Sequence, residues 1–201
     1  MAQVVVAQQW LHAYSFSRDT ISDLGNTSCG SWNGRFVCSP GHGLMNASLV
    51  ALGVTMALGS VFSCRFARNR GSVAGLAAMA ASGLGVVLAG LFPENSIPAL
   101  HGLGTAVPFV AGNAGLIILA FAYDLPVPLR LYSFLSGMVA FLALVTYASG
   151  HFAGLGEGGI ERVVAYPQAV WLVVVGFYRL ARGPDRRARV GGPGPPVRAA
   201  T

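Results

Sequence analysis

The stretch SVAGLAAMAASGLGVVLAGLF at residues 72–92 carries no charged side chain along its whole length. About 20 apolar residues in a helix cover the roughly 30 Å hydrocarbon core of a bilayer, and soluble domains rarely bury so long a run. Four other stretches have a similar length and few or no charges. We therefore predict five transmembrane helices, at about residues 43–63, 72–92, 99–122, 131–150 and 161–181.

The composition of the whole chain agrees with a membrane protein. Hydrophobic residues make up 54% of the 201 positions, charged residues only 10%, and the mean hydropathy is +0.60. These values exclude an ordinary soluble domain, and three cysteines are too few for a disulfide-rich secreted scaffold. The formal charge of +6 comes with thirteen basic residues that are all arginines, most of them just beyond an apolar stretch. We therefore predict no nucleic-acid partner, because such arginines mark membrane topology.

Short connections rich in Gly, Pro, Asn and Asp separate the predicted helices, so neighbouring helices should be antiparallel. Their charges then fall on two sides. One side has ten arginines and two aspartates, a net charge of +8, and the other has three arginines and five acidic residues, a net charge of −2. The positive-inside rule places the +8 side in the cytoplasm. We predict a multi-pass protein of the plasma membrane with a cytoplasmic C-terminus.

The two ends of the chain differ from the bundle. Residues 1–13 begin with an apolar stretch that is too short to span a bilayer and lacks the features of a signal peptide. We interpret them as the remnant of a first transmembrane helix, with an amphipathic arm as the alternative. Residues 14–182 form the predicted transmembrane bundle domain. Residues 183–201, basic and rich in Gly and Pro, are predicted to be a disordered cytoplasmic tail.

Small residues on the predicted helices mark where helices can approach closely, because lipid tails give apolar side chains no reason to associate. The strongest pattern is a stripe every four residues in the second predicted span, and a weaker one pairs Gly53 with Gly59. Such faces serve packing within the bundle or between copies in an oligomer. The stripe consists of Ala77, Ala81, Gly85 and Ala89.

Several short motifs together resemble a known membrane family. They are YSF at 14–16, ISDLGN at 21–26, CSPGHGLMN at 38–46, LFPEN at 91–95, HGLG at 101–104, and GLG at 154–156 leading into Glu161 and Arg162. As a set, from about residue 14 to 178, they resemble the bacterial and archaeal family called domain of unknown function 998. The resemblance implies an all-α, polytopic transmembrane bundle of six helices in the complete architecture. This chain would supply five full spans and part of the first, and the family brings no established activity.

Acidic and imidazole side chains gather at one end of the predicted bundle, although they are far apart in the sequence. Antiparallel neighbours bring these helix ends to one surface, where ionisable groups near apolar surroundings are a functional hypothesis. The alternative is ordinary capping and solvated loops. The group comprises Asp19, Asp23, His42, Glu94, His101, His151 and Glu161.

Carboxyl groups under an apolar roof can hold a proton near neutral pH and act as general acids. We therefore predict an acid-base enzyme acting on a lipid-like or prenyl/terpenoid substrate, of cyclase or hydrolase type. Asp23 or Glu94 would donate the proton, His101 would orient or relay it, and Glu161 with Arg162 would hold a polar substrate end. The predicted catalytic residues are thus Asp23, Glu94, His101 and Glu161. The predicted substrate-binding residues are Asn46, Asn95, Asn113, Arg162 and Gln168.

Other interpretations remain open at this point. Asn113 lies near the bilayer middle, where a buried hydrogen bond between helices explains an amide equally well. Zinc held by His42, His101 and His151 is less favoured, because no compact pair of histidines is present. We predict no cofactor. A non-enzymatic module that binds lipid or a partner protein, and a small-molecule transporter, are the alternatives to an enzyme, and the predicted partners are membrane lipids or a hydrophobic small molecule.

The cysteines divide into a pair and a single residue. Cys29 and Cys38 lie nine residues apart on the side predicted to face outward. Disulfides persist in such oxidising surroundings. We therefore predict a disulfide between them in preference to a catalytic pair, and a reduced Cys64.

Overall fold

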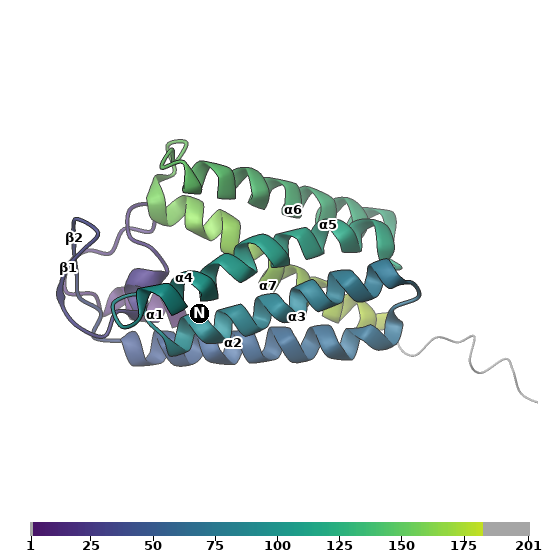
Figure 1. The fold of residues 1–201 in the computed structure, drawn as a ribbon, viewed down its shortest axis with the longest axis horizontal. Helices are drawn as coiled ribbons and strands as arrows, with labels where there is room; N and C mark the ends of the chain where they lie inside the picture. The colour runs from purple at the N-terminus through teal and green to yellow at the C-terminus, as the bar shows by residue number, and fades with distance from the viewer. Residues whose placement is uncertain (1, 183–201) are drawn as a thin grey trace, which may run out of the picture.

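The computed structural model describes residues 2–182 and shows an all-α bundle (Figure 1). The predicted tail at 183–201 lies outside these described residues. Five helical segments are long and apolar enough to cross a bilayer, which confirms the predicted fold class. The segments are α2 (His42–Ser63) with a 3₁₀ turn at Cys64–Phe66, α3 (Arg70–Leu91), α4 (Pro98–Val107) continuing into α5 (Asn113–Ala122), α6 (Val127–Ala148), and α7 (Gly156–Arg182).

Several helices begin at residues that stabilise the first turn of a helix. Asn69 caps α3, because its side chain accepts a hydrogen bond from the Ser72 backbone N–H at 2.8 Å. Proline stands in the first turn of α4 and of α6, where its missing N–H costs nothing. Helix α7 begins at Gly156, five residues before the predicted start, so Glu161 lies inside the helix.

The third span bends in its middle. Proline cannot donate the usual helical hydrogen bond, and a π-helical turn at Pro108–Gly112 joins α4 to α5. The Pro108 carbonyl accepts a hydrogen bond from the Gln168 side chain in α7 at 2.7 Å. As a result α5 packs on α3 and α6, whereas α4 packs on α3. Figure 1 shows α6 close to α5 and diverging from α4 towards the left-hand end of the molecule.

A cap formed by residues 14–41 covers that end, which we call the hairpin end. It holds a short 3₁₀ helix, Ser22–Gly25, and an antiparallel hairpin of β1 (Gly30–Trp32) and β2 (Arg35–Val37) that the sequence analysis did not predict. Asn33 and Gly34 form its turn with positive φ angles of 47° and 75°, as a two-residue hairpin turn requires. The opposite end, where α3 begins and α7 ends, is the arginine end.

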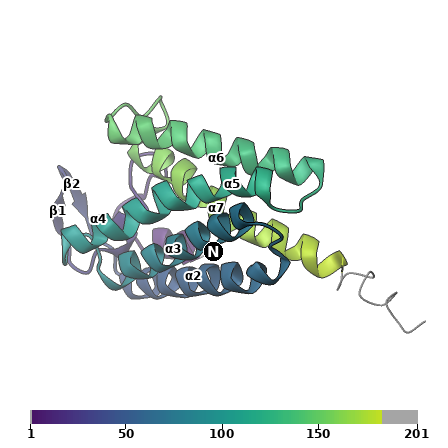
Figure 2. The same cartoon turned by 45° about the vertical axis from the view of Figure 1, so that its right-hand side comes forward.

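The N-terminal helix α1 (Ala2–Gln8) lies against the cap and the start of α2. Its Val6 is fully buried with Leu24 of the cap and Met45 of α2. Figure 2 shows the same bundle turned by 45°, with α2 and α3 running side by side along their length. The cap therefore rests on a small apolar cluster that it shares with α1 and α2.

Close contact between α2 and α3 depends on glycine. A Cβ atom at Gly53 would lie 2.4 Å from the carbonyl oxygen of Gly83, so the two backbones touch. Gly59, the predicted partner of Gly53 in a packing motif, meets nothing within 4 Å. In the predicted stripe of α3, Gly85 and Ala89 are buried, whereas Ala77 is exposed. A small residue is therefore needed for packing only where its own helix crosses another helix closely.

Candidate functional site at the hairpin end

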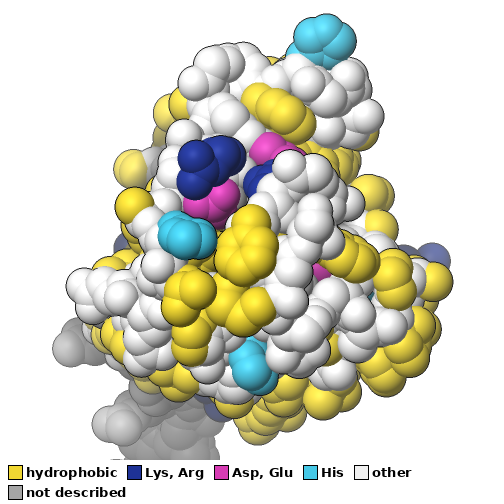
Figure 3. All heavy atoms as spheres, turned by 90° about the vertical axis from the view of Figure 1, so that its left-hand side faces the viewer, with side chains coloured by type: hydrophobic (Ala, Val, Ile, Leu, Met, Phe, Trp, Pro, Cys, Tyr) yellow, Lys and Arg dark blue, Asp and Glu magenta, His cyan; other side chains and the backbone are white. Residues whose placement is uncertain are grey.

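The polar side chains of the hairpin end are buried to an unusual degree for charged groups. Figure 3 looks at this face and shows acidic and arginine side chains side by side near its middle, next to hydrophobic ones. Burial of so many ionisable groups requires partners for each of them. The buried members are Asp19, Asp23, Asn26, His101, Glu161 and Arg162.

Glu161, Ser22 and His101 form a continuous hydrogen-bonded chain. The Ser22 hydroxyl lies 3.3 Å from Oε1 of Glu161 and 2.9 Å from Nε2 of His101. The other ring nitrogen of His101, Nδ1, lies 2.9 Å from the Phe92 carbonyl oxygen. Glu161 comes from α7, Ser22 from the cap and His101 from α4, so three elements meet in what we call the Glu161–Ser22–His101 chain.

The hydrogen-bond partners of the Glu161–Ser22–His101 chain determine how many protons these three side chains hold. A carbonyl only accepts, so Nδ1 of His101 carries a hydrogen and donates to Phe92. The Ser22 hydroxyl has a single hydrogen between two groups that can both accept it. Ser22 can therefore donate only one of these two hydrogen bonds and must accept in the other. The bond in which Ser22 accepts needs a second proton, which lies either on Glu161 or on Nε2 of His101. The geometry therefore supports two forms that differ by moving one proton through Ser22.

Asp23 is occupied by groups of the protein itself. It is fully buried, and its carboxylate pairs with Arg35 of β2 at 2.9 Å. It also accepts a hydrogen bond from the Thr20 backbone N–H at 2.7 Å, while the Thr20 hydroxyl accepts from the Asp23 N–H. Arg35 bonds on its other side to Glu157 at the start of α7. This ion-pair network fastens the hairpin to the bundle.

Glu94 lies in the loop between α3 and α4, where the Asn26 side chain donates a hydrogen bond to it at 3.0 Å. Burial, and then repulsion by the Asp23 carboxylate, raise the pKa of Glu94 from 4.5 to about 8. Glu94 therefore keeps its proton at neutral pH, as a general acid must.

The pKa of Glu94 predicts how stability depends on pH. The folded protein holds this proton more tightly than the unfolded chain does, so stability falls as pH rises from about 4.5 to 8 and is flat above that. We expect a decrease of about 1–2 kcal/mol over this range, after allowing for partial solvent screening. Glu94→Gln should remove this part of the decrease in unfolding measured from pH 5 to 8. The exposed Asp124→Asn should keep it, and equal slopes in the wild type and Glu94→Gln would contradict the assignment.

A cavity of about 320 Å³ opens where α4 diverges from α6. Its polar side includes Glu94, Arg35, His101 and Glu161, and its apolar side is formed by side chains of α6 and of the bend. A smaller cavity of about 90 Å³ lies on the α2 side of the chain. Ser22, His101 and Glu161 line both cavities, so the chain stands in the wall between them. We call the larger cavity the wedge, and the residues of its apolar side are Phe109, Val110, Leu144, Tyr147 and Ala148.

Arg162 holds the cap onto α7. Its Nη1 donates hydrogen bonds to the backbone carbonyls of Phe16 at 2.9 Å, Asp19 at 3.0 Å and Gly158 at 2.7 Å. Its other terminal nitrogen donates to the Tyr14 hydroxyl. The predicted role of Arg162 in substrate binding remains a prediction, and the structure places its terminal nitrogens on the protein's own oxygens.

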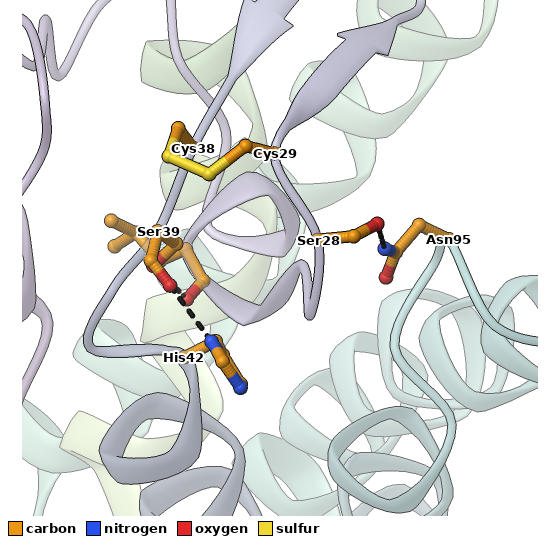
Figure 4. The surroundings of a disulfide bond; sticks show 7 residues. Ser28, Cys29, Cys38, Ser39, His42 and Asn95 are labelled. Atoms are coloured by element: carbon orange, nitrogen blue, oxygen red, sulfur yellow. Dashed lines mark hydrogen bonds between the residues drawn. A yellow bond between two sulfur atoms is a disulfide. The ribbon is translucent and has the colours of Figure 1, made fainter.

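The predicted substrate-binding amides occupy two places. Asn46 donates to the Gly25 carbonyl at 2.9 Å, and Asn95 donates to the Ser28 hydroxyl at 2.9 Å (Figure 4), so both contact the cap. Asn113 and Gln168 lie at the bend of the third span. Asn113 donates to the Val164 carbonyl of α7 at 3.1 Å, which is a hydrogen bond between helices. Gln168 also lines the smaller cavity.

The histidines proposed for zinc do not converge. His42 Nδ1 bonds to the Ser39 carbonyl at 2.8 Å (Figure 4), His151 is exposed, and His101 belongs to the chain described above. Residues 2–182 contain no group of three His, Cys, Asp or Glu side chains placed to hold a metal ion.

Cys29 and Cys38 are joined by a disulfide at the base of the hairpin (Figure 4). This bond closes the loop that carries Arg35, so it supports the ion-pair network with Asp23.

Ser22 and Arg35 are the central residues that the sequence analysis did not select. Ser22 lies within the ISDLGN motif directly before Asp23, and that position was the available signal. Arg35 was recognisable only as one of the few cations at an otherwise acidic end. Both depend on the path of the cap, which carries no periodic pattern.

The part of the chain that matches a known family is nearly the same as the part that forms the bundle. The family model described as "Protein of unknown function (DUF998)" matches residues 1–178. The chain belongs to this family. The match confirms the resemblance found from the motifs, and it takes in all five candidate spans up to the last turn of α7. Neither the curated proteins nor the solved structures compared with the chain gave a match. The chain is thus a multi-spanning membrane protein of an uncharacterised family.

Proposed function

We propose that this DUF998 member is a membrane-embedded acid-base enzyme that acts on a lipid-like substrate at the hairpin end. The observation that carries the proposal is the position of the Glu161–Ser22–His101 chain in the wall of the wedge. A carboxyl, a hydroxyl and an imidazole in line can deliver or remove a proton at an apolar surface, where water competes little.

The wedge supports a substrate with one polar end and an apolar body. Its polar side offers Glu94 and the Arg35–Glu157 pair, and its apolar side offers Val110 and Leu144. Val110 is 52% exposed on the membrane-facing surface, so an apolar chain can enter from the bilayer between α4 and α6. A prenyl or terpenoid chain fits this description.

The residues take distinct roles in this proposal. His101 and Glu161 transfer the proton to or from the substrate, with the Ser22 hydroxyl passing it between them. Glu94 keeps its own proton near neutral pH and is the second acid. Asp23, first interpreted as a proton donor, is better suited to a positioning role because Arg35 and Thr20 occupy its oxygens.

The test is lipid and metabolite profiling of membranes that contain the protein at equal expression. The wild type should yield a product that disappears with His101→Ala and Glu161→Gln, because each change removes one end of the proton chain. His151→Ala is the matched control, since this histidine is exposed at the same end. No change in any lipid or product between the wild type and His101→Ala would refute catalysis.

A non-catalytic lipid-binding module is the second candidate. It is supported by the many polar groups of the site that already bond to the protein itself, including Arg162 and Asp23. In that case the same unaltered lipid should co-purify with the wild type and with His101→Ala.

We also propose that the hairpin end faces outward in the plasma membrane and that the C-terminus is cytoplasmic. The excess of arginine at the opposite end supports this orientation through the positive-inside rule. Reporter domains fused at the C-terminus and within the hairpin turn should report opposite sides.

A further inference from the structure

A second cavity region lies at the arginine end, far from the proposed acid-base site. It has a volume of about 300 Å³ and lies between the connection from α5 to α6 and the last turns of α7. Its charged lining groups are Asp124, Arg179 and Arg182, and its apolar ones include Phe66 and Leu125. Neither cavity of the hairpin end shares a residue with it.

Arg179 is held in a fixed position at this cavity. Its Nη2 donates to the backbone carbonyl of Asp124 at 2.5 Å. Its guanidinium lies 4.8 Å from the centre of the Tyr123 ring and 5.4 Å from that of Phe66. Its buried Nε has no hydrogen-bond partner within residues 2–182. A planar guanidinium fixed in this way is prepared for an anion without losing further side-chain freedom.

The Asp124 carboxylate, which lines this cavity, does not neutralise Arg179 and Arg182. Asp124 is paired with Arg68 at 3.1 Å, on a surface where both side chains are more than half exposed. Arg182 lies over the Tyr178 ring at 4.8 Å and is an exposed residue at the end of α7. Two guanidiniums therefore face a cavity whose only acidic lining side chain, within the described part of the chain, already has a cation.

The depth of the cavity matches the headgroup layer of a bilayer. Helix α3 has 22 residues and is thus about 33 Å long at 1.5 Å per residue, close to the hydrocarbon thickness. The arginine end of the bundle therefore lies at the level of lipid phosphates. Phe66 and Leu125 supply apolar surface on which the glycerol and the first methylenes of a lipid can rest.

We propose that this cavity binds the phosphate of an anionic phospholipid through Arg179 and Arg182. Arginine binds phosphate oxygens with two parallel hydrogen bonds, and basic pockets at this depth suit anionic headgroups. The proposal is independent of the acid-base function at the hairpin end.

The test measures lipid retention by the full chain in detergent, by native mass spectrometry with phosphatidylglycerol or phosphatidylcholine as probes. The wild type should retain one phosphatidylglycerol in preference to phosphatidylcholine. Arg182→Gln should weaken this binding about ten-fold, the usual effect of one charge-assisted hydrogen bond. Arg179→Lys, which keeps the charge and loses the planar fork, should weaken it as well.

Arg70→Gln is the matched control, because it removes the same charge at the same end from an exposed residue outside the cavity lining. It should bind phosphatidylglycerol like the wild type. Equal loss in Arg70→Gln and Arg182→Gln would reduce the effect to surface charge and overturn the site. Displacement of the lipid by millimolar inorganic phosphate would show that the cavity selects free phosphate, which would also overturn the proposal of a lipid ligand.

Discussion

Arg162→Ala is expected to lower the free energy of unfolding by about 3–5 kcal/mol, the cost of leaving a buried polar network without its charged partner. The change leaves the carbonyls of Phe16, Asp19 and Gly158 without their common donor. Each buried carbonyl left without a donor costs about 1–3 kcal/mol, less whatever entering water recovers. The cap would then separate from α7, so denaturant unfolding in detergent, followed by tryptophan fluorescence, should show an earlier transition.

Two variants control this prediction. Arg162→Lys keeps the charge but presents a single ammonium, which cannot reach three carbonyls and the Tyr14 hydroxyl together, so we expect an intermediate loss. Arg18→Ala removes a neighbouring arginine whose side chain is 65% exposed and should change little. If Arg162→Ala unfolds at the same denaturant concentration as Arg18→Ala, the carbonyl contacts do not hold the cap.

Gly53→Ala should destabilise the bundle by about 3 kcal/mol or more, at the upper end of the cost of adding a methyl group to a tightly packed core. The added Cβ would lie 2.4 Å from the Gly83 carbonyl oxygen and 2.6 Å from the Val87 backbone nitrogen. Backbone atoms cannot rotate away as side chains do, so α2 and α3 must separate along their whole contact. Thermal unfolding followed by size-exclusion chromatography measures the change.

Gly59→Ala provides a matched comparison on the same helix. A Cβ at Gly59 meets nothing within 4 Å, and alanine favours a helix over glycine by up to about 1 kcal/mol. We therefore expect Gly59→Ala to be neutral or slightly stabilising. Equal losses for the two variants would mean that the crossing of α2 and α3 does not depend on close backbone approach.

The spans were predictable from sequence because the bilayer imposes a length and excludes charges. The same rule explains why acidic and imidazole groups from distant segments were expected at one end, since antiparallel helices alternate their termini. The boundary of α7 was less predictable. Glu161 and Arg162 resemble the end of a loop in sequence, but their partners in the cap allow both to be buried inside the helix.

The connections within the site were not predictable, because they depend on the path of the cap. The Ser22 hydroxyl meets His101 across 79 positions of sequence, and no periodic pattern relates two such residues. Arg35 reaches Asp23 only because a hairpin turn reverses the chain after Trp32. For Asn113, the polarity of a mid-membrane amide did indicate a buried partner, although the acceptor itself could not be named.

The bend of the third span separates the residues that shape the wedge from the ionisable residues that line it. The Gln168 amide of α7 holds the angle between α4 and α5 through the Pro108 carbonyl. The ionisable groups that line the wedge lie at the hairpin end, away from this bond. A change at Gln168 would therefore alter the angle of the bend and the width of the wedge, without removing any of its ionisable groups. Under the proposed function, substitution of Gln168 should therefore change which hydrocarbon bodies are accepted and keep the same proton chemistry.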